Sequence, residues 1–310
     1  MIELFARSPG MREAAGLAER VSSTDANVLI TGESGAGKDV FASFIHSKSR
    51  RASQPLVKID CATLPGELLE AELFGYERGA FTGASEAKPG RFEAAQKGTV
   101  VLDEIAHLST DAQAKLLRVI ETREFERLGG RNTIKLDARL IALTNVDLAQ
   151  AVKAGRFRED LLYRLDVIHI RVPPLRERKD DLPKLIKHFV TQYATKHGRK
   201  LDGASARALA MLESYDYPGN ARELANIIER AVIVASGKRI EEDDLSPGLT
   251  AAVSARRQKE KPPSLAELEA SYIAEVLART NGNKTECARI LGISRKNLYE
   301  KIARYDLNRG

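Results

Sequence analysis

A glycine-rich segment between a β-prone run and a helical pattern carries the clearest chemistry in the chain. Residues 26–31 are β-prone, Gly32-Glu-Ser-Gly-Ala-Gly-Lys-Asp39 follows, and residues 40–46 have helical spacing. Glycines let backbone N–H groups point at phosphate oxygens, and a helix N-terminus adds positive potential. This order predicts a P-loop that binds a nucleotide, with a glycine turn without a ligand as the alternative. The residues expected to hold the nucleotide are Gly32, Glu33, Ser34, Gly35, Ala36, Gly37, Lys38 and Asp39.

Two acidic residues follow a second apolar run. Thr99-Val-Val-Leu precedes Asp103 and Glu104, which is the pattern of a buried parallel strand. The carboxyl ends of such strands are where α/β sheets bind ligands. With the P-loop, these acids predict an ATP site in which Asp103 holds Mg²⁺ and Glu104 orients the attacking water. Asp39 is a second candidate Mg²⁺ ligand. The alternative for Asp103 and Glu104 is that they are ordinary surface residues.

The surrounding patterns predict an α/β domain followed by helices. Residues 55–60 and 138–144 are further strand candidates, and Ser109 is expected to cap an amphipathic helix over 111–120. After Pro173-Pro174 the pattern is helical and indicates a small lid. We therefore predict an α/β fold with a parallel sheet, a helical lid and a separate all-α domain at the C-terminus.

The last fifth of the chain carries almost all of its excess charge. Residues 251–310 contain twelve Lys or Arg and seven Asp or Glu, so they hold +5 of the net charge of +6. Helical runs over 284–291 and 295–305 flank a turn at Gly292, which predicts a helix-turn-helix. The charge favours DNA as the partner, and a helical dimerisation hairpin is the alternative. The residues expected to face DNA are Thr285, Ser294, Arg295, Lys296, Asn297 and Lys301.

Composition limits the class of protein. With 43% hydrophobic and 30% charged residues, the 310-residue chain is expected to be soluble, with two or three domains. No apolar run approaches the roughly 18 residues of a membrane span, and no secretory signal is visible. Cys61 and Cys287 lie far apart, which argues against a disulfide framework or a zinc site. We expect no membrane association and a cytoplasmic location.

Gly79-Ala-Phe-Thr-Gly-Ala84 has neither helical nor strand periodicity. The plain interpretation is a buried turn with Phe81 as a core anchor. However, the segment and the preceding Glu70-Ala-Glu-Leu-Phe-Gly-Tyr76 resemble the signature loop of bacterial enhancer-binding proteins, the AAA+ ATPases that activate sigma-54 RNA polymerase. Helical patterns on both sides predict a loop inserted within a helix rather than a hairpin tip. In that family the loop touches sigma-54, which assigns this contact to Gly79, Ala80, Phe81, Thr82, Gly83 and Ala84.

Further segments resemble motifs of the same family. An acidic residue at the position of Asp39 is usual there, and residues 124–130 resemble the second pore loop, which supports the signature loop. Asn145 matches the sensor I position, where a polar strand end reads the γ-phosphate. Residues 217–224 resemble sensor II, with Arg222 reaching the nucleotide of the same subunit.

Residues 155–165 resemble a third family signature, in which Arg158 and Arg164 match arginine fingers. A finger stabilises the charge that develops on the phosphoryl group of ATP in the neighbouring subunit. The resemblance therefore implies a ring. Surface arginines paired with Glu159 or Asp160 are the alternative.

The chain departs from the family pattern at Asp60. The family often has Asn there, and that residue restrains the catalytic glutamate until sigma-54 is engaged. An ionised Asp accepts hydrogen bonds but cannot donate one. A switch role for Asp60 and a simple polar strand end therefore stay open.

The resemblance covers essentially the whole chain and implies a sigma-54-dependent transcriptional activator. The implied domains are an AAA+ α/β core (1–172), a helical lid (173–248), a linker (249–264) and a Fis-type helix-turn-helix domain (265–310). The implied cofactors are ATP and Mg²⁺. The implied partners are sigma-54 holoenzyme, double-stranded enhancer DNA, further copies in a hexameric ring formed from dimers, and a separate regulatory protein. Because the ATPase starts almost at residue 1, we expect a short form without an N-terminal regulatory domain, or a truncated form.

Two rival functions would use part of this machinery. A non-catalytic DNA-binding repressor would keep the fold but lack ATP hydrolysis. The intact Lys38, Glu104 and Phe81 argue against such a loss of activity. A AAA+ DNA-processing motor, such as a helicase or its loader, would work without sigma-54. Neither rival accounts for Phe81.

Overall fold

The computed structural model describes residues 4–251, 264–280 and 282–305. The chain divides into two compact units, Met1–Thr250 and Ala251–Gly310. Most of the expected linker, residues 252–263, lies outside the described residues. Among the helices described, none has the length and hydropathy needed to cross a membrane.

A five-stranded parallel sheet forms the centre of the first unit; four of its strands were predicted, and β9 was not. Its strands are β1 (Val28–Thr31), β2 (Leu56–Asp60), β5 (Thr99–Asp103), β8 (Arg139–Thr144) and β9 (Ile168–Arg171), in the order β2-β5-β8-β1-β9. β8 is buried along its whole length and β5 along all but its last residue, because helices cover both faces. The carboxyl ends of these strands meet at one edge, where the P-loop begins.

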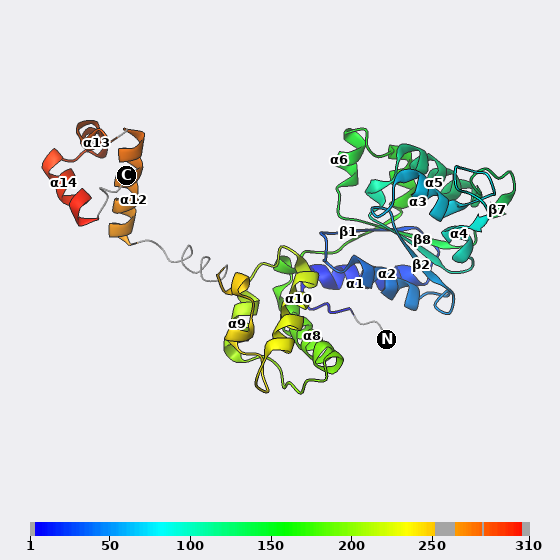
Figure 1. Ribbon diagram of the computed structural model, residues 1–310, viewed down its shortest axis with the longest axis horizontal. Coiled ribbons are helices and arrows are strands. Elements are labelled where there is room, and N and C mark those ends of the chain that lie inside the picture. Colours follow the sequence, from blue (N-terminus) through cyan, green and yellow to red (C-terminus); the bar gives the residue numbers. More distant parts are fainter. Residues whose placement is uncertain (1–3, 252–263, 281, 306–310) are drawn as a thin grey trace. The chain divides into compact units, whose positions relative to one another are not determined.

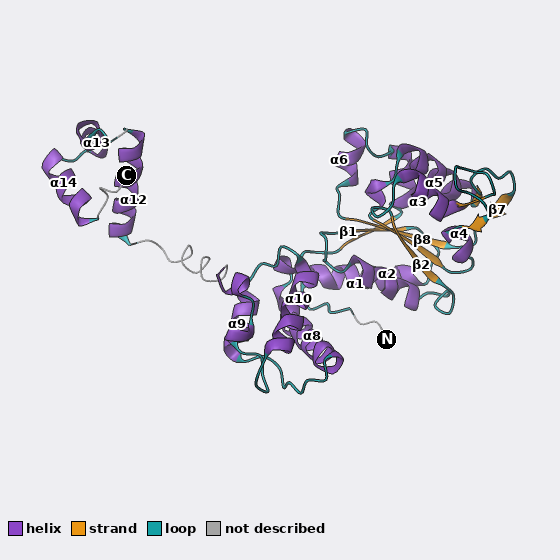
Figure 2. Ribbon diagram, in the orientation of Figure 1, coloured by secondary structure: helices purple, strands orange, loops and turns teal. Residues whose placement is uncertain are grey.

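Helices cover both faces of this sheet (Figure 1, Figure 2). On one face, α1 (Pro9–Ser22) and α2 (Lys38–Ser47) bury Met11, Phe41 and Ile45 against the strands. Helix α5 on the other face begins after Ser109, whose hydroxyl accepts a hydrogen bond from the N–H of Ala112, as predicted. The helices of this second face are α3 (Gly66–Phe74), α4 (Arg91–Ala94), α5 (Thr110–Thr122), α6 (Leu148–Lys153) and α7 (Glu159–Leu165).

The segment that contains Phe81 differs from the prediction. After α3, the short strands β3 (Gly75–Tyr76) and β4 (Lys88–Pro89) pair antiparallel before α4 begins. The loop is therefore the tip of a short hairpin, and the prediction of an insertion within a helix is wrong. The cause is Gly75, which ends α3 at φ 77° and where an added Cβ would lie 2.6 Å from the backbone nitrogen of Gly90. A second hairpin, β6 (Glu124–Glu126) and β7 (Thr133–Lys135), lies further along the chain.

A helical lid follows β9 and is tied to the start of the chain. Two 3₁₀ turns, Leu175–Glu177 and Lys179–Asp181, lead into α8 (Leu182–Lys196), α9 (Ala206–Ser214) and α10 (Asn220–Val234). The fully buried Asp181 carboxylate accepts hydrogen bonds from the N–H and the hydroxyl of Ser8. Arg178, also buried, donates to the carbonyl oxygen of Ala36 at 2.6 Å. The lid therefore contacts both the N-terminal segment and the P-loop.

The second unit consists, in its described part, of α12 (Leu265–Arg279), α13 (Lys284–Leu291) and α14 (Arg295–Arg304). Gly292 ends α13 at φ 66°, and the hydroxyl of Ser294 caps α14 by accepting from the N–H of Asn297. This geometry confirms the predicted helix-turn-helix. Its core consists of Ile273, Val276, Cys287, Ala288, Leu298 and Ile302.

Candidate nucleotide site, loop and DNA surface

The glycine-rich segment joins β1 to α2, as its sequence context predicts. Gly37 has φ 104°, and α2 begins directly at Lys38. Lys38 is 7% exposed, and its Nζ donates to the carbonyl oxygen of Gly32 at 2.9 Å. The same Nζ lies 3.7 Å from Oε1 of Glu104. The lysine thus lies between the loop and the acidic end of β5.

The two acids at the end of β5 meet the predicted sensor residue. Glu104 has a left-handed backbone, φ 52°, which is uncommon for a residue with a side chain and is typical of functional sites. Its Oε2 accepts a hydrogen bond from the N–H of Asn145 at 3.2 Å. Asp103 Oδ1 accepts from the N–H of Glu104 at 3.0 Å. The sheet therefore brings Lys38, Glu104 and Asn145 together, although they come from different parts of the chain.

The candidate magnesium ligands converge on a lysine that the sequence motifs do not include. Nζ of Lys58 lies 2.5 Å from Oδ1 of Asp39 and 2.8 Å from Oδ2 of Asp103. Two carboxylates facing one positive charge are a donor set that also suits Mg²⁺. Within the described ranges, no group of three or more His, Cys, Asp or Glu side chains could hold a metal. The residues present fit a Mg²⁺ ion that takes its remaining oxygen ligands from phosphate and water.

Lid residues contact the P-loop through a cluster of hydrogen bonds. Arg222 donates to Oγ of Ser34 at 3.0 Å, which places the predicted sensor II arginine beside the loop. The buried Asn220 donates to the Glu33 carboxylate and to the carbonyl oxygen of Ser34, both at 3.0 Å. Arg176 donates twice to Glu33, at 2.6 and 2.8 Å. The hydrogen bonds from Arg176 and then from Asn220 lower the pKa of Glu33 to about 2, so Glu33 is ionised at neutral pH.

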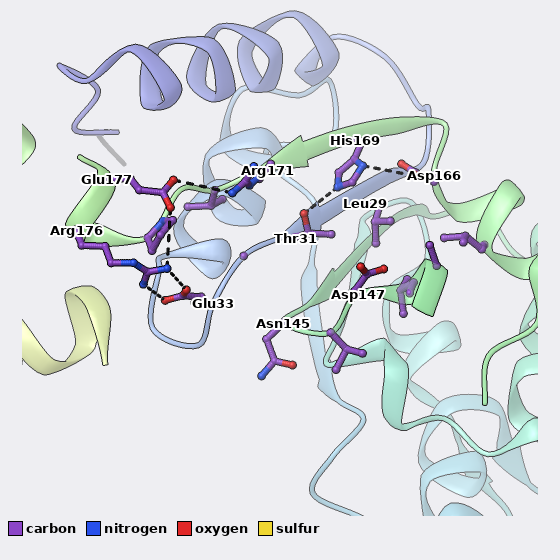
Figure 3. Close-up of a pocket in the computed structure, with 17 residues that line it drawn as sticks. Leu29, Thr31, Glu33, Asn145, Asp147, Asp166, His169, Arg171, Arg176 and Glu177 are labelled. Atoms are coloured by element: carbon purple, nitrogen blue, oxygen red, sulfur yellow. Dashed lines mark hydrogen bonds and ion pairs between the residues drawn. The ribbon is translucent and has the colours of Figure 1, made fainter. Parts of the chain in front are cut away.

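A cavity of about 430 Å³ borders the P-loop at the carboxyl ends of β1, β8 and β9. Glu33 and Asn145 both line it, and Figure 3 shows Arg176 directed at Glu33. On another wall, Nε2 of His169 lies 2.8 Å from the hydroxyl of Thr31. The cavity is open space beside the predicted γ-phosphate sensor, Asn145.

A more apolar cavity of about 340 Å³ lies against the same loop. Its walls come from the N-terminal segment, the start of α2 and the lid helix α8, and the rings of Phe5 and His188 are 5.2 Å apart. Apolar walls beside a phosphate loop suit a flat base. The motifs did not reveal this cavity, because its three walls are far apart in sequence. The wall residues nearest the loop are Ala36, Gly37, Val40 and Phe41.

The predicted arginine fingers lie on the surface of the chain. Arg158 is 41% exposed and pairs with Asp160 at 2.7 Å. Arg164 is 59% exposed and pairs with Glu121 at 3.0 Å. In the described part of the chain, neither arginine contacts a residue of the P-loop or the end of β5. This placement suits either a contact to a second subunit or the alternative of surface ion pairs.

Asp60 lies at the end of β2, beside Asp103 in the strand register. Its Oδ1 accepts a hydrogen bond from the N–H of Ala62 at 2.9 Å. Among the hydrogen bonds of the described residues, none joins Asp60 to Glu104. The switch role of Asp60 therefore stays a prediction.

The loop around Phe81 is exposed. Phe81 is 37% exposed, and its ring packs edge-on against Tyr76 with a centroid distance of 5.0 Å. Gly79 and Gly83 have φ of 84° and 110°, and added Cβ atoms would meet nothing within 4 Å at either position. This exposure argues against the alternative of a buried core anchor.

Residues 127–130 brace the stem of this loop. The N–H of Leu128 donates to the carbonyl oxygen of Gly75, and the N–H of Glu77 donates to the carbonyl oxygen of Leu128, both at 2.9 Å. Arg127 adds ion pairs to Glu93 at 2.7 Å and to Glu77 at 3.2 Å. The β6–β7 hairpin thus contacts the stem of the β3–β4 hairpin through hydrogen bonds and ion pairs, as expected of a supporting loop.

In the second unit, the residues expected to face DNA gather at the start of α14. Residues 294–297 are exposed, and so is Thr285 at the start of α13. Lys301 differs from them, because its Nζ lies 2.6 Å from Oε1 of Glu269 on α12 and only 21% of its side chain is exposed. Lys301 therefore ties α14 to α12.

Comparison with known families agrees with this geometry. The "Sigma-54 interaction domain" family matches residues 4–171, an "AAA+ ATPase lid domain" matches 176–262, and "Bacterial regulatory protein, Fis family" matches 264–305. The chain belongs to the sigma-54 activator family. It is an AAA+ ATPase with a C-terminal helix-turn-helix, which confirms the predicted family, fold class and enzyme class.

Curated and solved relatives match along nearly the whole chain. Regulatory protein AtoC of Escherichia coli strain K12 is 45% identical over 316 residues, covering 98% of this chain and 68% of AtoC. FlbD of Caulobacter vibrioides is 43% identical over 318 residues, covering 97% of this chain and 70% of FlbD. The crystal structure of NtrX from Brucella abortus in complex with ATP has a TM-score of 0.72 at 34% identity, covering 98% of this chain and 69% of NtrX.

Proposed function

We propose that this protein uses ATP hydrolysis to remodel the closed promoter complex of sigma-54 RNA polymerase through the loop at Phe81. The observation that carries the proposal is the position of this exposed loop. It is inserted between β2 and β5, whose adjacent ends bear Asp60 and Asp103. A loop connected through α3 and α4 to these strands can respond to the state of the nucleotide. The family assignment supports sigma-54 as the target.

In the proposed site, each group has one task. Lys38 and the loop N–H groups bind the phosphates, with Arg222 reaching them from the lid. Asp39 and Asp103 would hold Mg²⁺, which would neutralise charge on the phosphate oxygens. Glu104 orients the water, because Lys38 and the N–H of Asn145 hold its carboxylate. The apolar cavity beside the P-loop would receive the base of ATP.

We propose that Arg158 and Arg164 act on ATP in a neighbouring subunit of a hexameric ring formed from dimers. Their exposure supports this role, as does the lack of an ion pair to the acidic end of β5 among the described residues. Asp160 and Glu121 hold the two guanidinium groups until a second subunit offers phosphate oxygens. A site divided between subunits makes hydrolysis depend on assembly.

The helix-turn-helix would bring this ring to double-stranded enhancer DNA. Residues 294–297 and Thr285 are exposed on a basic unit, so they can reach base edges or phosphates. Lys301 would contribute through its ion pair with Glu269, by fixing α14. We also propose domain divisions at residues 172, 248 and 264, control by a separate regulatory protein, and action in the bacterial cytoplasm.

The proposal is tested with purified protein, sigma-54 holoenzyme and a sigma-54 promoter that has an upstream enhancer. We expect heparin-resistant open complexes with ATP, and none with the non-hydrolysable analogue AMP-PNP. A promoter of another sigma class is the control and should not respond. ATP hydrolysis without any open complexes would refute the proposed target. Unwinding of free DNA without polymerase would support the rival motor function.

A further inference from the structure

Lys58 lies outside every motif of the nucleotide site, yet it touches two of its acids. It belongs to β2, the edge strand of the sheet, and its side chain is 46% exposed. From there its ammonium reaches Asp39 on α2 and Asp103 at the end of β5, at 2.5 and 2.8 Å. In the described part of the chain, these are the ion pairs in which Asp39 and Asp103 take part. The contact therefore links three elements of the site through one charge.

The two carboxylates need such a charge when no metal is bound. Two carboxylates held close together repel each other, and a nearby cation offsets the electrostatic energy of this repulsion. Lys38, the other lysine of the site, faces Glu104 and the carbonyl oxygens of Gly32 and Glu33. Lys58 is thus the cation in position to neutralise Asp39 and Asp103.

We propose that Lys58 is an internal counterion of the magnesium site, which holds Asp39 and Asp103 in the metal-free protein and is displaced when Mg²⁺ binds with nucleotide. This inference rests on the proposed role of these two acids as Mg²⁺ ligands. An ammonium and a Mg²⁺ ion cannot both lie between the same carboxylate oxygens, since Mg²⁺ requires them at about 2.0–2.1 Å. The long stem of lysine and its half-exposed position allow it to swing into solvent. Lys58 is therefore a positioning residue that competes with the metal.

The test measures how much Mg²⁺ is needed to stabilise the full chain in the presence of ADP. The unfolding midpoint is followed at a fixed ADP concentration while Mg²⁺ is raised, so turnover does not enter the readout. In Lys58→Met we expect the half-maximal Mg²⁺ concentration to fall about 3- to 10-fold, because a competing positive charge is gone. Without metal and nucleotide, the same variant should unfold at a lower temperature than wild type. Lys58→Gln should give the same shift if the Met variant folds poorly.

Matched variants separate this inference from the proposed metal site. Lys196→Met removes a lysine from a comparable pair with Glu229, at 2.7 Å on the lid, and should leave the Mg²⁺ dependence unchanged. Asp103→Asn should abolish the Mg²⁺ dependence. Suppose that Asp103→Asn abolishes the Mg²⁺ dependence but Lys58→Met needs as much Mg²⁺ as wild type, or more. The counterion role of Lys58 is then refuted, while the proposed metal site stands. If Asp103→Asn keeps the full Mg²⁺ effect, the metal site itself is wrong.

Discussion

Glu104 is held in place from two sides. Lys38 lies 3.7 Å from one carboxylate oxygen, and the N–H of Asn145 donates to the other at 3.2 Å. Its left-handed backbone, φ 52°, sets the direction in which the side chain leaves β5. A carboxylate fixed in this way can polarise a water beside the γ-phosphate without having to reorganise first.

Replacing Glu104 by Gln should separate binding from hydrolysis. The amide keeps the shape of the side chain but cannot accept a proton from water. We expect ATP binding to persist while the rate of hydrolysis falls by about 10²–10⁴-fold. Equilibrium binding of ATP and steady-state phosphate release measure the two effects. Glu229→Gln on the lid is the control, and a hydrolysis rate in Glu104→Gln equal to this control would exclude the assigned role.

At the scale of single residues, local motifs were predictable and long-range partners were not. Lys38, Asp103 and Glu104 could be assigned because each follows a recognisable strand or loop. Lys58, Asn220 and the walls of the apolar cavity acquire their roles only from side chains of other elements. Neither spacing nor composition encodes which lysine of an edge strand will reach across to Asp103.

At the scale of elements, the loop depends on two hairpins that hold each other. Backbone hydrogen bonds join Leu128 to both sides of the stem, at Gly75 and Glu77. The prediction from sequence missed the first hairpin, because each of its strands has two residues, too few for a periodic pattern. By contrast, the strands β1, β2, β5 and β8 and the helix-turn-helix were predicted, since their patterns extend over four residues or more. The strand β9, Ile-His-Ile-Arg, was missed, because polar residues interrupt its apolar ones.

Arg127 is the side chain that ties the stem to its brace. It pairs with Glu93 and Glu77, and removing it leaves both carboxylates without this partner. We expect Arg127→Ala to weaken the brace by about 1–2 kcal/mol. Open-complex formation should therefore fall more than ATP hydrolysis, when both are measured on the same preparation.

The matched control for Arg127 is Arg118→Ala. Arg118 lies on the neighbouring α5, is 71% exposed and pairs with Glu126 at 3.5 Å, so its loss should change neither activity. If Arg127→Ala behaves like this control, the ion pairs of Arg127 do not influence the activity of the loop.

At the scale of the whole molecule, the proposed function divides the nucleotide site between two groups of residues that do not contact each other in the described part of the chain. In this proposal, Lys38 and Glu104 belong to one group, and Arg158 and Arg164 to the other. The resemblance to the family predicted this division, with surface ion pairs to Glu159 or Asp160 as the alternative. The structure shows both arginines exposed and paired with acids.

Mixing two inactive variants tests whether the site is shared. Lys38→Ala should lose nucleotide binding in its own site, and Arg158→Ala should lose roughly 10³-fold or more in hydrolysis. In a mixture, some interfaces combine an intact P-loop with an intact finger, so ATPase activity should reappear. Phosphate release is measured for each variant alone and for equal mixtures. A mixture no more active than its components would argue that Arg158 acts elsewhere.

The measurement that bears most directly on the central claim compares two activities of Phe81→Ala. Phe81 lies on the exposed loop and apart from the nucleotide site, so the variant should hydrolyse ATP as wild type does. Open-complex formation at a sigma-54 promoter should be lost. Ile233→Ala, which truncates a 52% exposed apolar residue on the lid, should keep both activities. Undiminished open-complex formation by Phe81→Ala would contradict the account.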